Sequence, residues 1–394
     1  MLSIFGASAG EGGHKMQEYS RRQFLKQLGA AAGLFLLSRN VLSFPKFDFS
    51  GASKTFEMLV VGDSHISGQG LEEKHKFFYL VKEWLQADVF GESRKVNLKV
   101  KAHSGSRIYL HEDELEAMQK AGDDINKFYH QEANLSSPSI QTQIDVARKE
   151  YGNADAVNLV MLSGGITDVL VANTINPFIK EKKMRALIHK YCNEAMFGLL
   201  EQTTGAFPNA LVVVVGYFPI ISTKSDVNKI SRYLFKPAKF PHPLQWTFTN
   251  PLSKQFMKIL RKKMAERSRI WVAESNREMR TAIAKINAKF DESRVLFVQS
   301  PITEENCFGT KNSLLWETNK DNLPGDERYA ERKKICSEVF DELKYQHYGK
   351  LSTRMCELAA IGHPNIEGAK AFAESIKNSL KPIFFSADQK LGSL

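Results

Sequence analysis

The sequence lacks several features that mark non-globular proteins or reveal a common ligand. Its 394 residues include only 13 prolines, and no internal repeat or low-complexity linker is evident, so the chain can bury the core of one large domain. Its four cysteines form no CxxC pair, which argues against a zinc site. Gly62, Gly68 and Gly70 do not have GxGxxG spacing and no P-loop lysine follows them, which argues against a nucleotide-binding loop.

No signature of a nucleic-acid-binding fold accompanies the positive charge of the chain. The formal net charge is +10, and Lys254–Lys289 alone holds eleven Lys or Arg against three Glu. Without a zinc-finger, RNP or helix-turn-helix pattern, we expect no nucleic-acid partner. The basic stretch is typical of a solvated helix face, and the alternative is peripheral contact with anionic lipid or another acidic polymer.

The apolar segment near the N-terminus is too short to cross a membrane. Leu28–Leu37 contains ten residues, whereas a spanning helix needs about 20. It follows the cationic Ser20–Lys26, as in a signal peptide. Arg21 and Arg22 resemble the twin-arginine (Tat) signal of bacteria, which implies export by the Tat machinery to the periplasm or the medium. We therefore assign residues 1–52 to a signal peptide and linker; an amphipathic first helix or an uncleaved anchor is the alternative.

Export changes the interpretation of the cysteines. In an oxidising compartment four cysteines allow three pairings. We expect Cys336 to pair with Cys356, because both precede the same C-terminal loop, and leave Cys192 and Cys307 unassigned. Reduced, buried cysteines are the alternative.

Short apolar runs alternate with helical stretches over residues 53–394, the predicted folded domain. Five runs rich in valine and leucine are expected to form strands: Phe56–Gly62, Val96–Ala102, Ala156–Leu162, Ala210–Gly216 and Val295–Gln299. Helices are expected over Leu71–Gln86, Met184–Gln202 and from Lys254 to about Phe290. This alternation predicts an α/β fold with a doubly wound, mainly parallel five-stranded sheet and helices on both faces.

A segment rich in proline and aromatic residues interrupts this alternation. Phe218–Asn250 contains four prolines and opens an insertion over about residues 217–291, which also includes the basic helix. We expect it near the exit of the fourth strand, as a lid that receives an acyl chain. The alternative is an aromatic loop that only packs against its own domain.

Polar and glycine-rich stretches follow the predicted strands. In sheets of this type ligands bind outside the carboxyl ends of the strands. The stretches are Gly62–His65, His103–Arg107, Ser163–Asp168 and, near the C-terminus, Gly362–Asn365.

In this order the four stretches resemble the sequence blocks of the GDSL, or SGNH, hydrolase family, over about residues 56–380. The resemblance implies a flavodoxin-like fold and a serine esterase or lipase that hydrolyses small-molecule or lipid carboxylic esters without a metal or other cofactor. The twin-arginine segment adds that this enzyme is exported. It maps the nucleophile to Ser64, an oxyanion donor to Gly105 and the general base to His363.

The chemistry requires the same residue types. A serine hydroxyl needs a neighbouring base to accept its proton as it attacks. His363 is our candidate, because Pro364 is suited to a helix start that anchors it. The helix would then bury one apolar face, made of Ile366, Ala369, Phe372 and Ile376. His65 is the rival base, and Asp63 is a candidate supporting residue.

Two positions depart from the family pattern. The Ser64 and Gly105 N–H groups and the side chain of Thr167 would form the oxyanion hole, but the family has asparagine at position 167; Asn173 is an alternative donor. The family places aspartate at position 360, where this chain has alanine. We therefore expect a Ser–His dyad whose imidazole is oriented by a backbone carbonyl, with Glu357 as the alternative orienting group.

Three rival functions remain open. Asp63 and His65 have the D-x-H spacing with which metallophosphoesterases begin, but the further ligand blocks of those enzymes are missing. A ligand-binding protein with the same fold is the second rival. The third is an acyltransferase, in which an alcohol replaces water as the acceptor.

Overall fold

Five parallel strands form the centre of the fold. The computed structural model describes residues 54–91, 93–230, 251–319, 323–345 and 350–385, all within one compact unit that spans residues 44–394. The predicted signal peptide at 1–52 and residues 231–250 of the predicted lid lie outside the described residues. No helix in the described part of the chain combines the length and the apolar character needed to cross a membrane.

The sheet confirms the predicted fold class. Its strands are β1 (Thr55–Val61), β2 (Lys95–Val100), β3 (Val157–Leu162), β4 (Leu211–Val215) and β5 (Val295–Val298). They lie in the order β2-β1-β3-β4-β5, and each neighbouring pair is parallel. The chain moves outward in opposite directions from β1 and β3. The carboxyl ends of these two strands are therefore the expected position of a ligand crevice.

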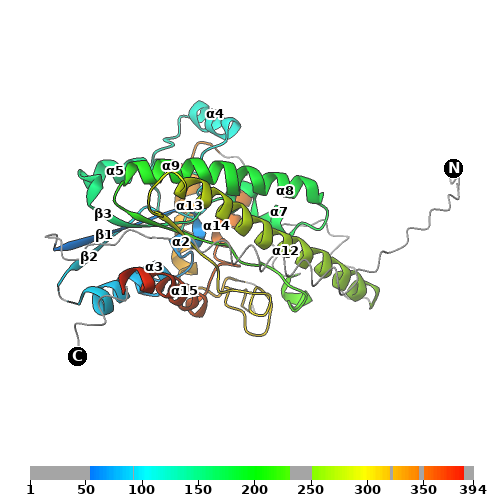
Figure 1. Cartoon of the computed structure of the whole chain (residues 1–394). Helices are drawn as coiled ribbons and strands as arrows, with labels where there is room; N and C mark the ends of the chain where they lie inside the picture. Colours follow the sequence, from blue (N-terminus) through cyan, green and yellow to red (C-terminus); the bar gives the residue numbers. More distant parts are fainter. Residues whose placement is uncertain (1–53, 92, 231–250, 320–322, 346–349, 386–394) are drawn as a thin grey trace, which may run out of the picture. The chain divides into compact units, whose positions relative to one another are not determined.

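Alternate residues of the strands face two apolar layers. On one face Met58 and Val60 of β1 pack with α3 (Phe77–Trp84) and α15 (Ile366–Phe384). On the other, Leu59 and Val61 pack with α5 (Ile140–Tyr151), α8 (Glu181–His189), α9 (Met196–Ala206) and α12 (Pro251–Asn287). Figure 1 shows these two groups of helices on opposite sides of the sheet, as the period of two along a strand requires.

Further helical elements complete the described chain. They are α2 (Ser64–Ser67), η1 (Glu73–His75), η2 (Leu85–Phe90), α4 (Glu112–Ala121), η3 (Ala154–Ala156), α6 (Ile166–Val169), α7 (Val171–Ile175), η4 (Lys190–Ala195), α13 (Tyr329–Glu342) and α14 (Lys350–Glu357).

The helix predicted over Leu71–Gln86 begins later than expected. Its α-helical part starts at Phe77, after the separate turn η1. Buried Lys76 has an extended backbone and packs closely on Gly68, where a Cβ atom would lie 2.8 Å from Lys76 Cγ. Tertiary packing of the turn before Lys76 therefore sets the start of the helix, against local helix preference.

The basic stretch forms one helix, α12. Near its start Met257, Leu260 and Met264 form a small apolar cluster with Ile220 and with Ile175 of α7, which lies outside the insertion. The described part of the predicted insertion thus packs against its own domain.

The predicted disulfide is confirmed. Cys336 of α13 and Cys356 of α14 are bonded, with Cα atoms 5.8 Å apart. Cys192 and Cys307 are buried and free. The bond joins the two helices that precede the C-terminal stretch Gly362–Asn365.

Candidate active site

Ser64 lies where β1 ends and α2 begins. It is the first residue of α2, with Asp63 as the N-cap and Gly68 in the left-handed conformation at the other end. Because it opens a helix, its N–H has no acceptor within that helix. Gly62 precedes this turn with a φ of +141°, and a Cβ there would lie 2.4 Å from the Ser163 carbonyl oxygen. The exits of β1 and β3 therefore meet so closely that only glycine fits.

The buried carboxylate of Asp63 connects three strand exits. It accepts hydrogen bonds from Ser163 Oγ at 2.6 Å, after β3, and from Tyr217 Oη at 2.5 Å, after β4. It also accepts from the His65 N–H at 3.1 Å, within its own helix cap. Burial raises the pKa of Asp63, while these donors oppose the rise. Asp63 thus sets the direction in which Ser64 leaves the sheet.

Gln143 of α5 connects this turn to the second polar stretch. Its side-chain oxygen accepts from Gly62 N–H at 2.8 Å, and its amide donates to Gly62 O at 3.1 Å and to Ser106 Oγ at 2.9 Å. Ser106 follows Gly105, a predicted oxyanion donor. Neither Gln143 nor Tyr217 is predicted from the sequence, because a lone polar residue in a helix or after a strand carries no local signal of a distant partner.

The structure brings Ser64 and His363 together. The Ser64 Oγ and His363 Nε2 atoms are 2.7 Å apart, although 299 positions separate them in the chain. Trp316 N–H donates to His363 O at 2.7 Å, and Gly362 N–H donates to Trp316 O at 2.9 Å. These bonds hold both sides of the histidine backbone.

The helix after His363 begins slightly later than predicted. Asn365 is the N-cap and its side chain accepts from Gly368 N–H, so Pro364 precedes the cap and is not the first helical residue. The side-chain cap satisfies one of the free N–H groups at the helix start. The predicted apolar face is otherwise confirmed, since Ala369, Phe372 and Ile376 are buried.

Desolvation of the ring keeps His363 neutral. It lowers the pKa of His363 to about 4, and the carbonyls of Ala359 and Ala360 oppose this by favouring the protonated ring. Nδ1 makes no well-formed hydrogen bond to any described residue. The ring is therefore a neutral base near pH 7.

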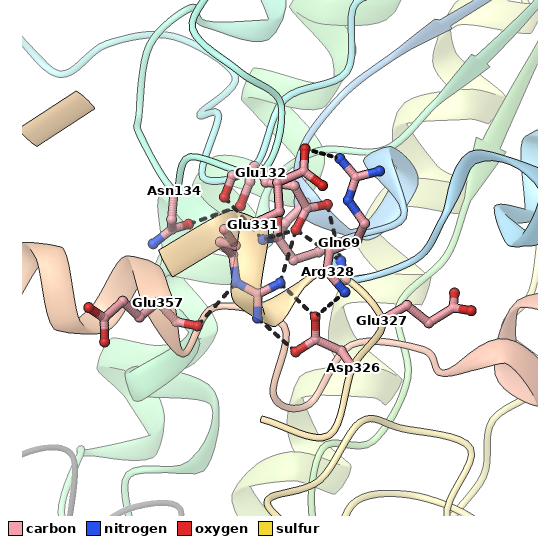
Figure 2. Close-up of polar contacts among 12 residues, drawn as sticks. Gln69, Glu132, Asn134, Asp326, Glu327, Arg328, Glu331 and Glu357 are labelled. Atoms are coloured by element: carbon pink, nitrogen blue, oxygen red, sulfur yellow. Dashed lines mark hydrogen bonds and ion pairs between the residues drawn. The ribbon is translucent and has the colours of Figure 1, made fainter. Parts of the chain in front are cut away.

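The carboxylate of Glu357 lies away from this ring. It pairs with Arg354 Nη1 at 2.6 Å, and in Figure 2 it points away from Asp326. The structure therefore places no Glu357 carboxylate against His363, and backbone carbonyls are the nearer polar groups.

Gly105, Thr167 and Asn173, predicted as oxyanion donors beside Ser64, lie in separate segments of the chain. Gly105 has a φ of +82°, and a Cβ there would lie 2.6 Å from both Leu135 N and O. Thr167 lies in α6 and is half-buried. Asn173 donates its amide to Val169 O at 2.7 Å, so this group is occupied within its own turn.

Asp168 joins α6 to the loop that follows Gly105. Its carboxylate accepts from the Ile108 N–H at 3.2 and 3.1 Å. Burial raises the pKa of Asp168 to about 7. The residue thus connects the stretch that contains Thr167 to the one that contains Gly105.

His65 has a different environment from His363. Its ring lies among four aromatic rings, and both ring nitrogens are buried without a hydrogen-bond partner among the described residues. The four are Phe77, Tyr217, Phe218 and Phe372. Burial lowers the pKa of His65 to about 3. His65 is thus a core residue with no hydrogen bond to Ser64.

We expect His65→Leu to stabilise the protein in acid. A neutral buried histidine must lose the proton that the unfolded chain binds below pH about 6.5, so its presence costs stability as the pH falls from there toward 3. We compare the free energy of unfolding of the variant with that of the wild type. The variant's advantage should be about 2 kcal/mol larger at pH 5 than at pH 8. Urea unfolding at both pH values measures this. An equal difference at the two pH values would contradict it.

One group of side chains among the described residues has the spacing of metal ligands. Glu72, His75 and Glu327 offer ligand atoms within 4.8 Å of one another. The Glu327 carboxylate already accepts from the Glu72 N–H and contacts His75 Nδ1. None of the three belongs to the polar stretches around Ser64 and His363.

Comparisons with known proteins find likeness only among solved structures. No family model and no curated protein matches the chain. A lipase from a goat rumen metagenome has 14% identity and a TM-score of 0.38, with 82% of this chain and 97% of the other covered. The extracellular lipase of Streptomyces rimosus has 14% identity and a TM-score of 0.40, with 82% and 99% covered. Phospholipase A1 of Streptomyces albidoflavus has 11% identity and a TM-score of 0.40, with 83% and 100% covered. Function has to be inferred from the side chains of this chain itself.

Proposed function

We propose that the chain is a serine hydrolase of carboxylic esters. The observation that carries this proposal is the 2.7 Å separation between Ser64 Oγ and His363 Nε2 at the carboxyl end of β1. A hydroxyl with a neutral base at this distance has the arrangement that nucleophilic catalysis needs. The resemblance of the four polar stretches to the SGNH pattern supports the same chemistry.

The reaction passes through an acyl-enzyme. Ser64 Oγ attacks the ester carbonyl carbon while His363 Nε2 takes the hydroxyl proton. The tetrahedral intermediate expels the alcohol, which receives that proton from His363. Water then attacks the acyl-enzyme with His363 again as the base, and release of the acid restores the Ser64 hydroxyl.

Two N–H groups and one hydroxyl are proposed to stabilise the oxyanion. The Ser64 N–H has no acceptor in its helix, and Gly105 makes no hydrogen bond to another described residue. We add the Thr167 hydroxyl as the third donor. Each such donor contributes about 10²- to 10³-fold in rate.

The dyad form of the mechanism follows from the surroundings of His363. The carbonyls of Ala359 and Ala360 favour the protonated ring, so they stabilise the imidazolium that forms during attack. Alanine at position 360 and the pairing of Glu357 with Arg354 leave this orienting role to the backbone.

Esters with an apolar acyl chain are the first substrates to test, because aromatic residues are concentrated in the predicted insertion.

We further propose that the chain is exported through the Tat pathway. The paired Arg21 and Arg22 support this, and the Cys336–Cys356 disulfide is typical of an oxidising compartment.

A fluorophosphonate probe tests the proposal. We expect Ser64 Oγ to displace fluoride and form a covalent bond to phosphorus, detected by mass spectrometry of the modified peptide. The labelling rate should rise with pH through about 4 and then level off, because His363 must be neutral to accept the proton. Ser64→Ala is the control for modification at other sites. Folded wild type that stays unlabelled at Ser64 would rule out the hydrolase and favour a binding protein.

A further inference from the structure

A buried cluster of three charged residues contacts the start of the segment that leads to His363. Arg332 of α13 donates to both carboxylate oxygens of Asp326, at 2.8 and 2.7 Å, and to Glu132 Oε2 at 3.0 Å. The side chains of Arg332 and Asp326 are 0% exposed and that of Glu132 is 2% exposed. Figure 2 shows Glu132 and Asp326 in this cluster. Burying such charges is costly, so the cluster is weak evidence for stability alone.

The cluster contacts the backbone on the His363 side. Arg332 Nε donates to the carbonyl oxygen of Glu357 at 3.1 Å. Glu357 is the last residue of α14, where the segment that carries Ala359, Ala360 and His363 begins. Arg332 therefore anchors the start of the segment whose carbonyls face the imidazole.

The same cluster contacts the backbone on the Ser64 side. Glu132 accepts from Gly70 N–H at 3.2 Å and from Gln69 Nε2 at 3.1 Å. These two residues follow Gly68, which caps the end of the short helix that Ser64 begins. One buried network thus connects the chain after the serine to the chain before the histidine.

The two backbone segments also meet directly. Gly70 has a φ of +85°, and a Cβ there would lie 2.7 Å from Ala360 Cβ and 3.0 Å from Asp326 Cβ. Position 360, where the SGNH pattern has its aspartate, is therefore packed against the Gly70 turn beside the Asp326 carboxylate.

We propose that Arg332, which is bound by Glu132 and Asp326, is a positioning residue that holds the segment from Glu357 to His363 against the Gly70 turn. This role rests on the proposed function. These contacts of Arg332 keep the imidazole at hydrogen-bond distance from Ser64 in a chain whose position 360 carries no acid. The Cys336–Cys356 disulfide joins the same two helices, and Cys336 lies one turn after Arg332 on α13.

The charges of the cluster also act on His363. Arg332 lowers the pKa of His363 and Asp326 raises it, while neutral His65 of α2 is the other titratable ring that interacts with it. Removing Arg332 should therefore raise the pKa of His363, and neutralising Asp326 should lower it further. Loss of packing alone would not produce opposite shifts.

The first experiment compares Arg332→Met with Arg354→Met. Arg354 is the matched control, because it pairs with the Glu357 side chain and not with its carbonyl. We expect Arg332→Met to lower the fluorophosphonate labelling rate at Ser64 about 100-fold, the typical cost of a misplaced catalytic group, and Arg354→Met to change it less than about threefold. Arg332→Lys should resemble Arg332→Met, because an ammonium cannot make the paired contacts of a guanidinium. A folded Arg332→Met variant that labels at the wild-type rate would overturn the proposal.

A triple variant separates positioning from stability. Glu132→Gln, Asp326→Asn and Arg332→Met together remove the charges of all three cluster residues, so no carboxylate is left without Arg332, and the triple variant should be more stable than Arg332→Met alone. We expect its labelling rate to stay low, because the Glu357 carbonyl still lacks its donor. Recovery of the wild-type rate together with stability would show that the cluster serves folding only.

Titration of the histidine rings by NMR gives a readout that does not need activity. We expect the pKa of His363 to rise in Arg332→Met and to fall in Asp326→Asn. If the folded wild type is not labelled at Ser64, the proposed function fails, and this titration alone decides the proposal about Arg332. An unchanged His363 pKa in both folded variants would overturn it.

Discussion

Replacing Ser64 by alanine, or His363 by alanine, will each lower kcat by about 10⁴-fold or more, and the double replacement will lower it no further. In the proposed mechanism the two groups act as one unit, because the hydroxyl proton would pass to the ring across their 2.7 Å contact during attack. Either loss therefore removes the nucleophile in its active form. The measurement is kcat on a series of p-nitrophenyl esters of increasing chain length, for all three variants.

His65→Leu is the matched control for this experiment. His65 is next to Ser64 in sequence but is buried among aromatic rings with no hydrogen bond at either ring nitrogen, and the variant should keep kcat within about threefold. If the loss of kcat in the double variant equals the product of the two single losses, Ser64 and His363 act independently. A loss in His65→Leu as large as in His363→Ala would transfer the role of base to His65.

Replacing Asp63 by alanine will lower the free energy of unfolding by about 4 kcal/mol. The helix cap contributes about 1 kcal/mol, and each buried hydroxyl left without its acceptor, on Ser163 and Tyr217, costs about 1–3 kcal/mol. The exits of β1, β3 and β4 would lose the group that joins them. Urea unfolding of the folded variant measures the loss.

Asp63→Asn is the control for this loss. It keeps one oxygen that can cap α2 and accept one hydroxyl, so about half of the destabilisation should return. The fluorophosphonate labelling rate of Asp63→Ala should also fall, because Ser64 directly follows the capping residue. A change in stability below about 1 kcal/mol in Asp63→Ala would show that the three strand exits are held by other contacts.

The strands and helices differ in how well local sequence predicts them. The runs that became β3 and β4 were predicted to within one residue of their observed ends, because valine-rich runs bounded by polar residues fit only a strand buried on both faces. The helix predicted from Leu71 begins at Phe77 instead, because contact between Lys76 and Gly68 overrides helix preference there.

The candidate site shows the same division. Ser64 and His363 were predicted from short patterns at strand and helix boundaries, and the structure brings them together. Tyr217 and Gln143, which hold the Ser64 turn, escaped prediction. Their partners lie 154 and 81 positions away, and one tyrosine or glutamine among many has no local pattern.

Local sequence was enough to predict the five-stranded α/β architecture and to propose Ser64 and His363 as the catalytic pair, because apolar periodicity and short motifs are properties of neighbouring residues. The proposed support of the histidine became visible only in the folded chain. Arg332 and Glu132 meet across 200 positions with both side chains enclosed, and in the sequence each is an ordinary charged residue. A buried charge is tolerable only beside its partner, and that pairing exists only after the chain has folded.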